Sequence, residues 1–411
     1  MKIVQVQYSS KSGGGAALKL HNAFLDAGID SHVLTLHDDI NDTDRVIYCG
    51  RKAKIRARFE DMINDFVNRK SNKEFGLFSY PFLGTDISRH RVVKEADIIY
   101  IHWVQKGFLN FSGYREIAKT GKPVIIFMHD MWSITGGCHH SFTCEKYKTE
   151  CYDCQVFPGH KKNDLSARGF RKKMKLYSGF SNFYFVSPSK WLKECAESAS
   201  LTRNRKIFLI PNLLDRKIFR PVDKKSARIL LNIDNGNHVI AFGALAIDSP
   251  YKGWEYLKNA LDKLKGTFPE TSVSILIFGK CNIEVMRKLI PFHAVFTGYL
   301  KDEYSAALVY NAADVFVTPS LADNLPTTVL ESLSCGTPVV GFRTGGIPDM
   351  IEHKINGYLA EYRNSDDLAE GIKYCLSNNI RGKISSGFEN ENIMKSHMSL
   401  VNQLLNKSTH L

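Results

Sequence analysis

The sequence predicts an α/β protein built from two doubly wound parallel sheets. Short apolar stretches alternate with stretches of helical spacing along the 411 residues, and this alternation begins again after Pro221. Strands that alternate with helices are connected by right-handed crossovers, which produce parallel sheets. A chain of this length has room for roughly two to three domains, so we assign one sheet to each half.

The first half opens with the apolar stretch Lys2–Tyr8, which we expect to be a buried strand. The glycine-rich turn Ser12–Gly15 leads into a helix that Gly28 ends, because glycine commonly terminates helices. The other elements expected here are strands Ser31–Leu36, Asp97–His102, Pro123–Met128, Asn182–Val186 and Lys206–Ile210, and a helix around Tyr114–Thr120. No apolar run approaches the ~20 residues of a membrane span, and no signal peptide is recognisable, so we expect a cytoplasmic location.

The second half repeats the pattern. Its expected strands are His238–Phe242, Val273–Phe278, Val315–Thr318 and Val339–Gly341, and its expected helices are Trp254–Lys265, Glu303–Asn311 and Thr328–Ser334. The tail from Asn390 has helical spacing and many polar residues. We therefore expect one domain over residues 1–213, a second over residues 214–389, and a helix over residues 390–411 that caps a domain or crosses back to the first.

One segment of the second half combines features of a nucleotide-sugar site. The strand ending at Thr318 opens into a loop, and a helix begins near Thr328. Glu331 can accept hydrogen bonds from a vicinal diol such as a ribose, and Asp323 from a sugar ring. Ordinary capping of a turn and helix is the simpler alternative. Because the N–H groups of a helix start bind phosphate, the expected donor-binding residues are Asn324, Leu325, Pro326, Thr327 and Thr328.

The same segment resembles the signature of a known enzyme family. Asp323 and Glu331 are followed by Ser332–Gly341 and by the glycine turn Thr344–Asp349. This arrangement is similar to that of family 4 retaining glycosyltransferases of the GT-B fold, including bacterial capsule and colanic-acid-type transferases. The family usually has Glu where Asp323 stands, which bears on the identity of the donor more than on the role of the residue.

The resemblance implies two Rossmann-like domains that face a cleft, with residues 211–221 as the linker. It assigns the acceptor side to residues 1–213 and the donor side to residues 214–389. It further implies a retaining hexosyltransferase that uses a nucleoside diphosphate sugar, needs no cofactor for catalysis, and transfers to a lipid-linked saccharide. The catalytic residues carried over by similarity are His129, Asp323 and Glu331.

A leaving nucleoside diphosphate needs cations or amides around its phosphates. Lys252 stands where the family has a phosphate-binding lysine, whereas Ala244 replaces the arginine that often accompanies it. Arg343 is an alternative source of positive charge in the cleft. The glycines expected to bring backbone close to the donor are Gly14, Gly15, Gly345 and Gly346.

Polar residues also follow two expected strands of the first half. His129 and Asp130 come directly after Pro123–Met128, and His102 ends the preceding strand. The carboxyl ends of parallel strands are where ligands bind in this architecture. By similarity His129 contacts the donor sugar and phosphate, with His102 and Asp130 as further cleft residues. Histidines that cap or edge a core are the alternative.

Cysteines cluster in an insertion over residues 132–159. Cys138, Cys144, Cys151 and Cys154 have the spacing C-x5-C-x6-C-x2-C. In a cytosolic protein such a cluster is better explained by a tetrahedral metal than by disulfides, so we expect a structural zinc there. A reduced, tightly packed loop is the alternative.

Lysine and arginine outnumber aspartate and glutamate by 55 to 42, which gives a net charge of +13. Basic residues are dense at Arg51–Arg58 and at Arg168–Lys175. On a helix the apolar residues between them share one face: Ile55, Phe59, Met62, Ile63 and Phe66. This pattern fits attachment to an anionic membrane surface, and equally an amphipathic helix packed on a core. We find no platform for nucleic acid.

The sequence thus predicts a glycosyltransferase of surface polysaccharide biosynthesis, capsule or exopolysaccharide, peripheral on the inner face of the plasma membrane. Two alternatives remain: a sugar-nucleotide epimerase of the GT-B fold and a non-catalytic partner in polysaccharide assembly. The base and sugar of the donor, the acceptor and the linkage are not encoded in any motif.

Overall fold

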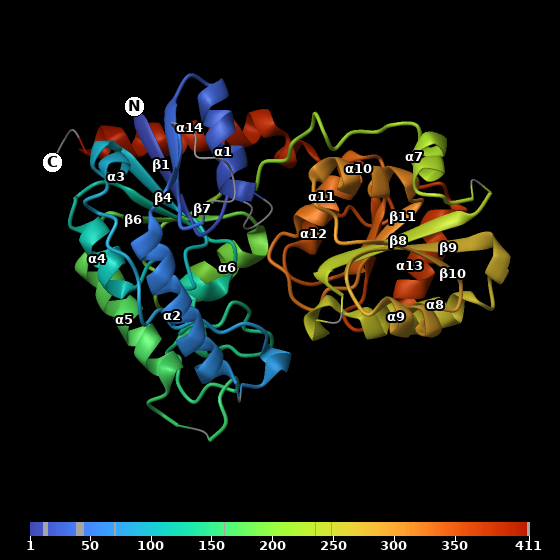
Figure 1. The fold of residues 1–411 in the computed structure, drawn as a ribbon, viewed down its shortest axis with the longest axis horizontal. Coiled ribbons are helices and arrows are strands. Elements are labelled where there is room, and N and C mark those ends of the chain that lie inside the picture. Colours follow the sequence, from blue (N-terminus) through green and yellow to red (C-terminus); the bar gives the residue numbers. More distant parts are fainter. Residues whose placement is uncertain are drawn as a thin grey trace. The chain divides into compact units, whose positions relative to one another are not determined.

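The computed structural model describes residues 1–10, 15–37, 45–69, 71–159, 161–234, 236–247 and 249–408. The chain forms two compact units, one of Met1–Leu213 with Asn390–Leu411 and one of Leu214–Glu389 (Figure 1). The chain therefore leaves the first unit once and returns to it with its last helix. Gly14, an expected donor-binding residue, lies outside the described residues.

The first unit contains a parallel sheet with the strand order β3-β2-β1-β4-β5-β6-β7. Its order reverses between β1 and β4, and ligands of such sheets bind at the carboxyl ends of strands beside this switch. The strands are β1 (Lys2–Gln7), β2 (Asp30–Thr35), β3 (Val46–Tyr48), β4 (Ile98–Ile101), β5 (Val124–Phe127), β6 (Phe183–Ser187) and β7 (Ile207–Leu209).

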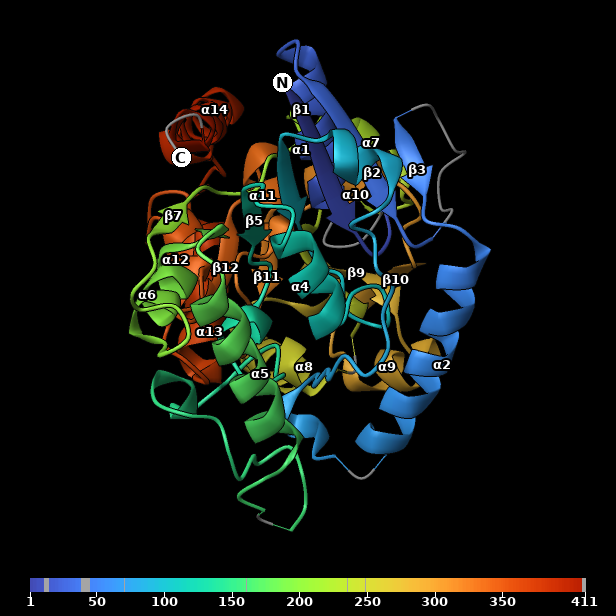
Figure 2. The ribbon, with the colours of Figure 1, turned by 90° about the vertical axis from the view of Figure 1, so that its left-hand side faces the viewer.

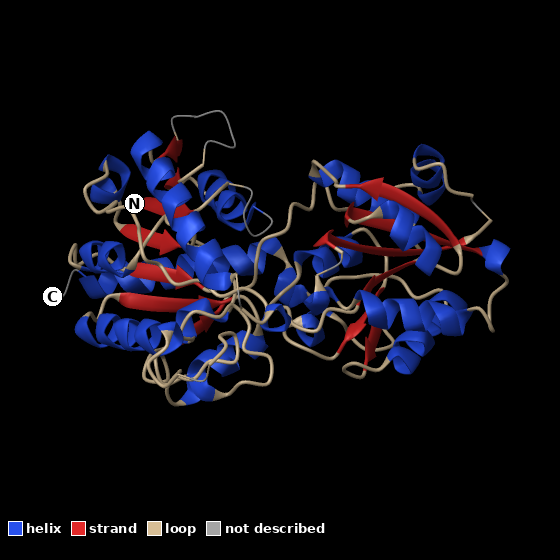
Figure 3. Ribbon diagram, turned by 60° about the horizontal axis from the view of Figure 1, so that its bottom comes forward, coloured by secondary structure: helices blue, strands red, loops and turns tan. Residues whose placement is uncertain are grey.

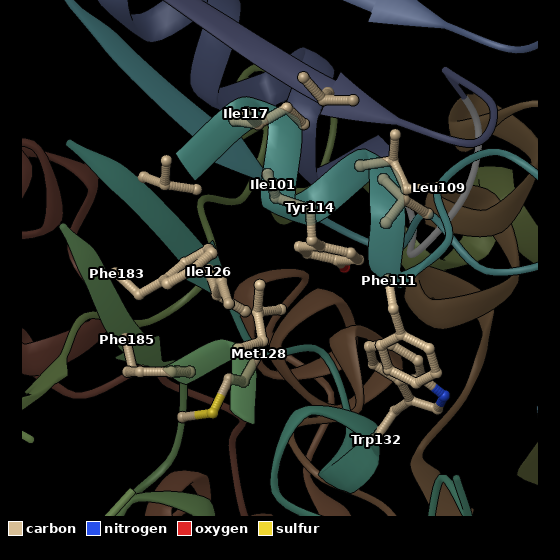
Figure 4. Packing of buried hydrophobic residues seen from close by; sticks show 14 of the residues in the cluster. Ile101, Leu109, Phe111, Tyr114, Ile117, Ile126, Met128, Trp132, Phe183 and Phe185 are labelled. Atoms are coloured by element: carbon tan, nitrogen blue, oxygen red, sulfur yellow. The ribbon is translucent and has the colours of Figure 1, made fainter. Parts of the chain in front are cut away.

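Helices cover both faces of this sheet, because successive strand residues point to opposite sides. Ile98 packs with α1 and α14, whereas its neighbour Ile99 belongs to the core under α2, α4, α5 and α6. Figure 4 shows the second of these cores, in which Ile101 and Ile126 of the sheet lie near Tyr114 of α4. The helices are α1 (Ala16–Asp26), α2 (Arg51–Asn68), α3 (Arg91–Glu95), α4 (Phe111–Ala118), α5 (Leu165–Gly179), α6 (Lys190–Ser198) and α14 (Asn390–Ser408).

The second unit contains a parallel sheet with the order β10-β9-β8-β11-β12-β13. Its strands are β8 (His238–Ala246), β9 (Val273–Lys280), β10 (His293–Gly298), β11 (Val315–Thr318), β12 (Val339–Phe342) and β13 (Gly357–Ala360). Its helices are α7 (Lys224–Leu230), α8 (Trp254–Leu264), α9 (Ile283–Leu289), α10 (Glu303–Ala312), α11 (Thr327–Ser334), α12 (Ile347–Met350) and α13 (Ser365–Ser377). Figure 3 shows the helices on both faces of each sheet.

The two doubly wound parallel sheets confirm the expected fold class. The edge strands β3, β10 and β13 were not expected from the sequence. Short 3-10 helices lie in the connections: η2 (Lys73–Phe75), η3 (Met131–Ile134), η4 (Lys146–Lys148), η5 (Pro250–Lys252), η6 (Glu270–Ser272) and η7 (Ser386–Phe388). None of the described helices has a stretch both long and apolar enough to cross a bilayer.

Candidate functional site

Three loops of the second unit meet at the carboxyl ends of the neighbouring strands β8, β11 and β12. The backbone N–H of Leu321 donates to the carbonyl of Tyr251 at 2.7 Å, which joins the loop after β11 to the turn η5. Gly253 lies so near Pro319 that a Cβ there would come within 1.9 Å of its carbonyl oxygen. The hydroxyl of Thr344, after β12, donates to the carbonyl of Leu321 at 3.5 Å. These contacts fix the three loops as one surface.

This surface brings two expected donor ligands into direct contact. Nζ of Lys252 donates to Oδ2 of Asp323 at 2.8 Å, and both side chains are partly buried. Burial on its own lowers the pKa of Lys252, but the charge and the hydrogen bond of Asp323 outweigh it, so the pKa is raised. The lysine therefore stays charged at neutral pH, held in place by the carboxylate.

The glycine turn after β12 packs on the backbone of Asp323. Gly345 has a φ of 55°, and a Cβ there would lie 1.8 Å from the carbonyl oxygen of Asp323. The N–H of Gly346 donates to the same oxygen at 3.3 Å. Both glycines thus position Asp323 through its main chain. Arg343, which begins this turn, is exposed.

Glu331 lies one turn into α11 and is 9% exposed. Its Oε2 accepts a hydrogen bond from the hydroxyl of Tyr310 on α10 at 3.0 Å. Burial, followed by the charge of Glu331, raises the pKa of Tyr310 well above its usual value. The phenol therefore remains a hydrogen-bond donor over the whole physiological range and keeps the Glu331 carboxylate oriented. The sequence alone did not identify Tyr310.

The start of α11 has the features of an anion site. Pro326 precedes the helix and gives no capping hydrogen bond, and no acidic residue lies in the first turn. Thr327 and Thr328 are its first two residues, and Asn324 and Leu325 are buried immediately before it. No carboxylate of the first turn therefore neutralises the positive end of the helix dipole, which is favourable for binding an anion.

In the first unit, His102 and His129 lie at the ends of the adjacent strands β4 and β5. Nδ1 of His102 lies 3.0 Å from Nε2 of His129, and Nε2 of His102 lies 2.8 Å from Oε1 of Gln5 on β1. The two imidazole rings stack with centroids 5.2 Å apart. Gln5, His102 and His129 form a polar row across three neighbouring strands.

Burial keeps both histidines of this row neutral. It lowers the pKa of His129 to about 4, a fall that Asp130 only partly opposes, and lowers that of His102 well below 6.5. If Oε1 of Gln5 accepts from His102, then His102 accepts from Nε2–H of His129, and the other ring nitrogen of His129 is an acceptor. Gln5 was missed, although a glutamine inside a buried strand was a usable signal.

Asp130 lies just before the cysteine-rich insertion and hydrogen-bonds to two of its residues. Its Oδ2 lies 2.6 Å from Nδ1 of His139, whose Nε2 lies 2.9 Å from the hydroxyl of Ser79. The backbone N–H of Trp132 donates to its other oxygen at 2.8 Å. Burial raises the pKa of Asp130, but His139 and this N–H outweigh it and the pKa is lowered. The carboxylate is thus engaged within the unit.

A buried lysine anchors the same insertion to α5. Nζ of Lys173 donates to the carbonyl of Thr135 at 3.0 Å and to that of Trp132, and lies 3.4 Å from the centroid of the Trp132 ring. Burial lowers the pKa of Lys173 to about 7. The insertion is therefore held against α5 by contacts of Lys173, not by bonds between its own cysteines.

The expected zinc site is not supported. Within the described residues, no group of three or more His, Cys, Asp or Glu side chains is placed to hold a metal ion. The four cysteines of the expected site, Cys138, Cys144, Cys151 and Cys154, are free thiols. Burial raises the pKa of Cys151 to about 12 and that of Cys154 to about 11, and the nearby thiol of Cys144 adds to both rises. The packed, reduced loop is the better description.

Gly15 begins α1 in the left-handed conformation, with a φ of 70°. The N–H of Ala17 donates to Oε1 of Gln7 at 3.1 Å, so a glutamine of β1 already occupies one N–H of this helix start. Gly15 thus precedes a helix start at which Gln7 already accepts from the N–H of Ala17, and its expected contact with the donor stays a prediction.

Two parallel-sheet units of this topology have the architecture of GT-B glycosyltransferases. The chain is similar over 99% of its length to the whole of sucrose-phosphate synthase from Thermosynechococcus elongatus, with 16% identity and a TM-score of 0.64. It is similar over its full length to the whole of HepE from Anabaena in complex with UDP-glucose, with 17% identity and a TM-score of 0.59. Likeness at these identities shows the fold.

Residues 236–378 match the family model described as "Glycosyl transferases group 1". The chain is 32% identical over 190 residues, 45% of its length, to sulfoquinovosyl transferase SQD2 of Arabidopsis thaliana, covering 35% of that protein. It is 24% identical over 374 residues to the putative colanic acid biosynthesis glycosyl transferase WcaC of Escherichia coli strain K12, covering 86% of this chain and 85% of WcaC. It spans about a third of the first curated relatives it matches.

Proposed function

We propose that this protein transfers a sugar from a nucleoside diphosphate sugar to a hydroxyl of a saccharide, with retention of anomeric configuration. The observation that carries the proposal is the shared surface of Lys252, Asp323 and the start of α11 at adjacent strand ends. A cation, a carboxylate and an anion-binding helix start are the groups that a sugar diphosphate requires.

Each group has a distinct part in this proposal. Lys252 and the N–H groups at the start of α11 stabilise the charge that develops on the leaving diphosphate. Asp323 positions Lys252 and accepts from a hydroxyl of the sugar, and Glu331, oriented by Tyr310, accepts from the ribose diol. The bond from the anomeric carbon to the phosphate oxygen breaks while the bond to the acceptor oxygen forms on the same face. The acceptor proton passes to the leaving phosphate.

His129 contributes as a neutral group. Because its pKa is lowered to about 4, the imidazole is uncharged at neutral pH. In the tautomer described above its second ring nitrogen is an acceptor, so we assign it a hydrogen bond from a hydroxyl of the donor sugar rather than proton donation to a phosphate. His102 and Gln5 fix its tautomer and are positioning residues.

The relatives suggest which compounds to test. HepE from Anabaena has been crystallised with UDP-glucose, which makes a UDP-hexose the first donor to try. The name of WcaC refers to colanic acid, which supports a role in capsule or exopolysaccharide synthesis. A lipid-linked saccharide is the acceptor we propose, in line with the net positive charge of the chain. Such an acceptor lies at the inner face of the plasma membrane, where we propose that the protein is peripherally bound.

A thermal-shift panel of UDP-, GDP- and ADP-sugars tests the donor site, because a ligand of the folded state raises the apparent stability. We expect one nucleotide class to raise Tm in the wild-type protein and in Glu352→Ala, an exposed control in the same unit. Glu331→Ala should lose that rise. A panel with no stabilising sugar nucleotide would overturn the donor assignment and favour a non-catalytic assembly partner.

Analysis of the reaction products distinguishes the proposed transferase from a sugar-nucleotide epimerase. With donor and saccharide acceptor, we expect a product whose anomeric proton coupling matches that of the donor, and loss of product in Glu331→Ala and His129→Ala. Epimerised donor formed without any acceptor would identify an epimerase, and an inverted product would exclude the retaining mechanism.

A further inference from the structure

Helix α2 presents a row of large apolar side chains to solvent. Ile55 is 47% exposed, Phe59 57%, Met62 67% and Phe66 78%. These residues recur at helical spacing, so they form one stripe, which spans roughly 17 Å of the helix. We call these four residues the α2 stripe. Figure 2 shows α2 along the outer edge of the first unit.

The α2 stripe is not the face by which α2 packs on the core of the first unit. The opposite face of α2 is buried through Ala53, Ala57 and Glu60. Gly107 lies so close that a Cβ there would be 2.6 Å from Cα of Ala57. The Glu60 carboxylate accepts from the backbone N–H groups of Phe82 and Leu83 at 3.0 and 2.7 Å. Rolling the helix would break these contacts, so the stripe remains outside.

Cations flank the α2 stripe. Arg51, Lys52, Arg56 and Arg58 are exposed in the first two turns, and the net charge of the chain is +13. At about 100° per residue, Arg51 and Arg58 lie on one side of the stripe and Lys52 and Arg56 on the other. The exposed Asp65 lies beside Phe66 on the first side, so the cations flank the N-terminal half of the stripe. An apolar stripe between two basic edges is the arrangement by which helices lie in the headgroup region of anionic bilayers.

We propose that the α2 stripe docks this protein on an anionic lipid bilayer, with Phe59, Met62 and Phe66 inserted below the headgroups and the basic edges on lipid phosphates. The proposal extends the proposed peripheral location and rests on it. A second copy of the chain is a poorer occupant, because two α2 helices would bring like charges together. Nucleic acid is also a poorer occupant, because it would bind the cations and leave the apolar side chains of the α2 stripe exposed to water.

Vesicle co-sedimentation tests this surface on the full chain. We expect binding to vesicles of phosphatidylcholine with phosphatidylglycerol, weak binding to phosphatidylcholine alone, and loss of binding as salt is raised. Phe59→Gln with Phe66→Gln should lower the partition by about tenfold or more, since binding scales with buried apolar area. The matched control, Ile229→Gln with Leu230→Gln, removes apolar side chains that are 67% and 72% exposed on α7 and should bind as the wild type does.

Three outcomes overturn the inference: no vesicle binding by the wild type, equal losses in both double variants, or a dimer in light scattering that the Phe59→Gln, Phe66→Gln variant abolishes. The sugar-nucleotide thermal shift on the same samples keeps the two proposals apart. A stripe variant that retains its donor-dependent Tm rise while losing vesicles supports the docking surface. If the wild type binds vesicles but no sugar nucleotide raises its Tm, the proposed activity is contradicted and the docking surface is not.

Discussion

Replacement of Gly345 by alanine tests the central claim that the turn after β12 positions Asp323. The backbone of Gly345 has a φ of 55°, where an L-residue with a Cβ costs roughly 1–2 kcal/mol. The added Cβ would also lie 1.8 Å from the Asp323 carbonyl oxygen, whereas real Cβ contacts stay beyond 3.0 Å. The Gly345 turn and the Asp323 backbone must therefore separate by about 1.2 Å (3.0 less 1.8 Å), which disturbs the carboxylate partner of Lys252.

A shift of about 1 Å in a positioning group can reduce turnover by about 100-fold. Gly298→Ala is the matched control, because Gly298 has a φ of 69° but, among the described residues, no atom beyond its chain neighbours lies within 4 Å of the place that a Cβ would take. Both variants should lose similar stability from backbone strain, and only Gly345→Ala should lose the additional donor-dependent rise in Tm and the turnover. Unchanged donor binding in Gly345→Ala, or an equal loss in Gly298→Ala, would refute the reasoning.

Three further changes follow from the buried polar contacts. Tyr310→Phe leaves the buried Glu331 without its phenol partner and should cost roughly 1–3 kcal/mol in urea unfolding; an unaltered midpoint would contradict the role of this bond. Gln5→Leu should weaken the donor Kd in titration calorimetry and lower kcat, since Gln5 fixes the tautomer of the histidine row whose His129 we assign to the donor; an unchanged Kd and kcat would contradict it. The pKa of Lys173 is about 7, below its unfolded value of about 10.4, so the unfolded chain binds more protons between these values and the free energy of unfolding should rise with pH there. Lys173→Met should show less of that rise between pH 7 and pH 9, and identical slopes would disprove it.

The fold was predictable because its signal is local and repeated. Strands such as Val124–Phe127 are buried on both faces, so they appear in the sequence as continuous apolar runs between helical stretches. Helix α2 shows the limit of this reasoning. Its apolar periodicity is the same whether the row faces core or solvent, and the close approach of Gly107 to Ala57 decides which face is inside.

The sequence predicted the types of residue in the candidate site but not which of them contact one another. Lys252 and Asp323 could each be assigned to the donor, but their ion pair depends on the pairing of β8 with β11 and is invisible in a linear sequence. The same holds for Tyr310 and Glu331, which lie on different helices. The cysteine spacing allowed a metal, whereas the described residues bring no three possible ligands together around one ion.

The return of α14 to the first unit has a consequence for how the chain can be cut. Two covalent crossings connect the units, near Leu213 and near Glu389. Cleavage at the first crossing leaves the second unit tethered through α14, whose Leu400, Val401 and Leu404 are buried in the first-unit core. Cleavage at the second crossing leaves it tethered through residues 213 and 214. Limited proteolysis should therefore release the second unit as a separate fragment only after both crossings are cut, and a singly nicked protein should still migrate as one particle under native conditions.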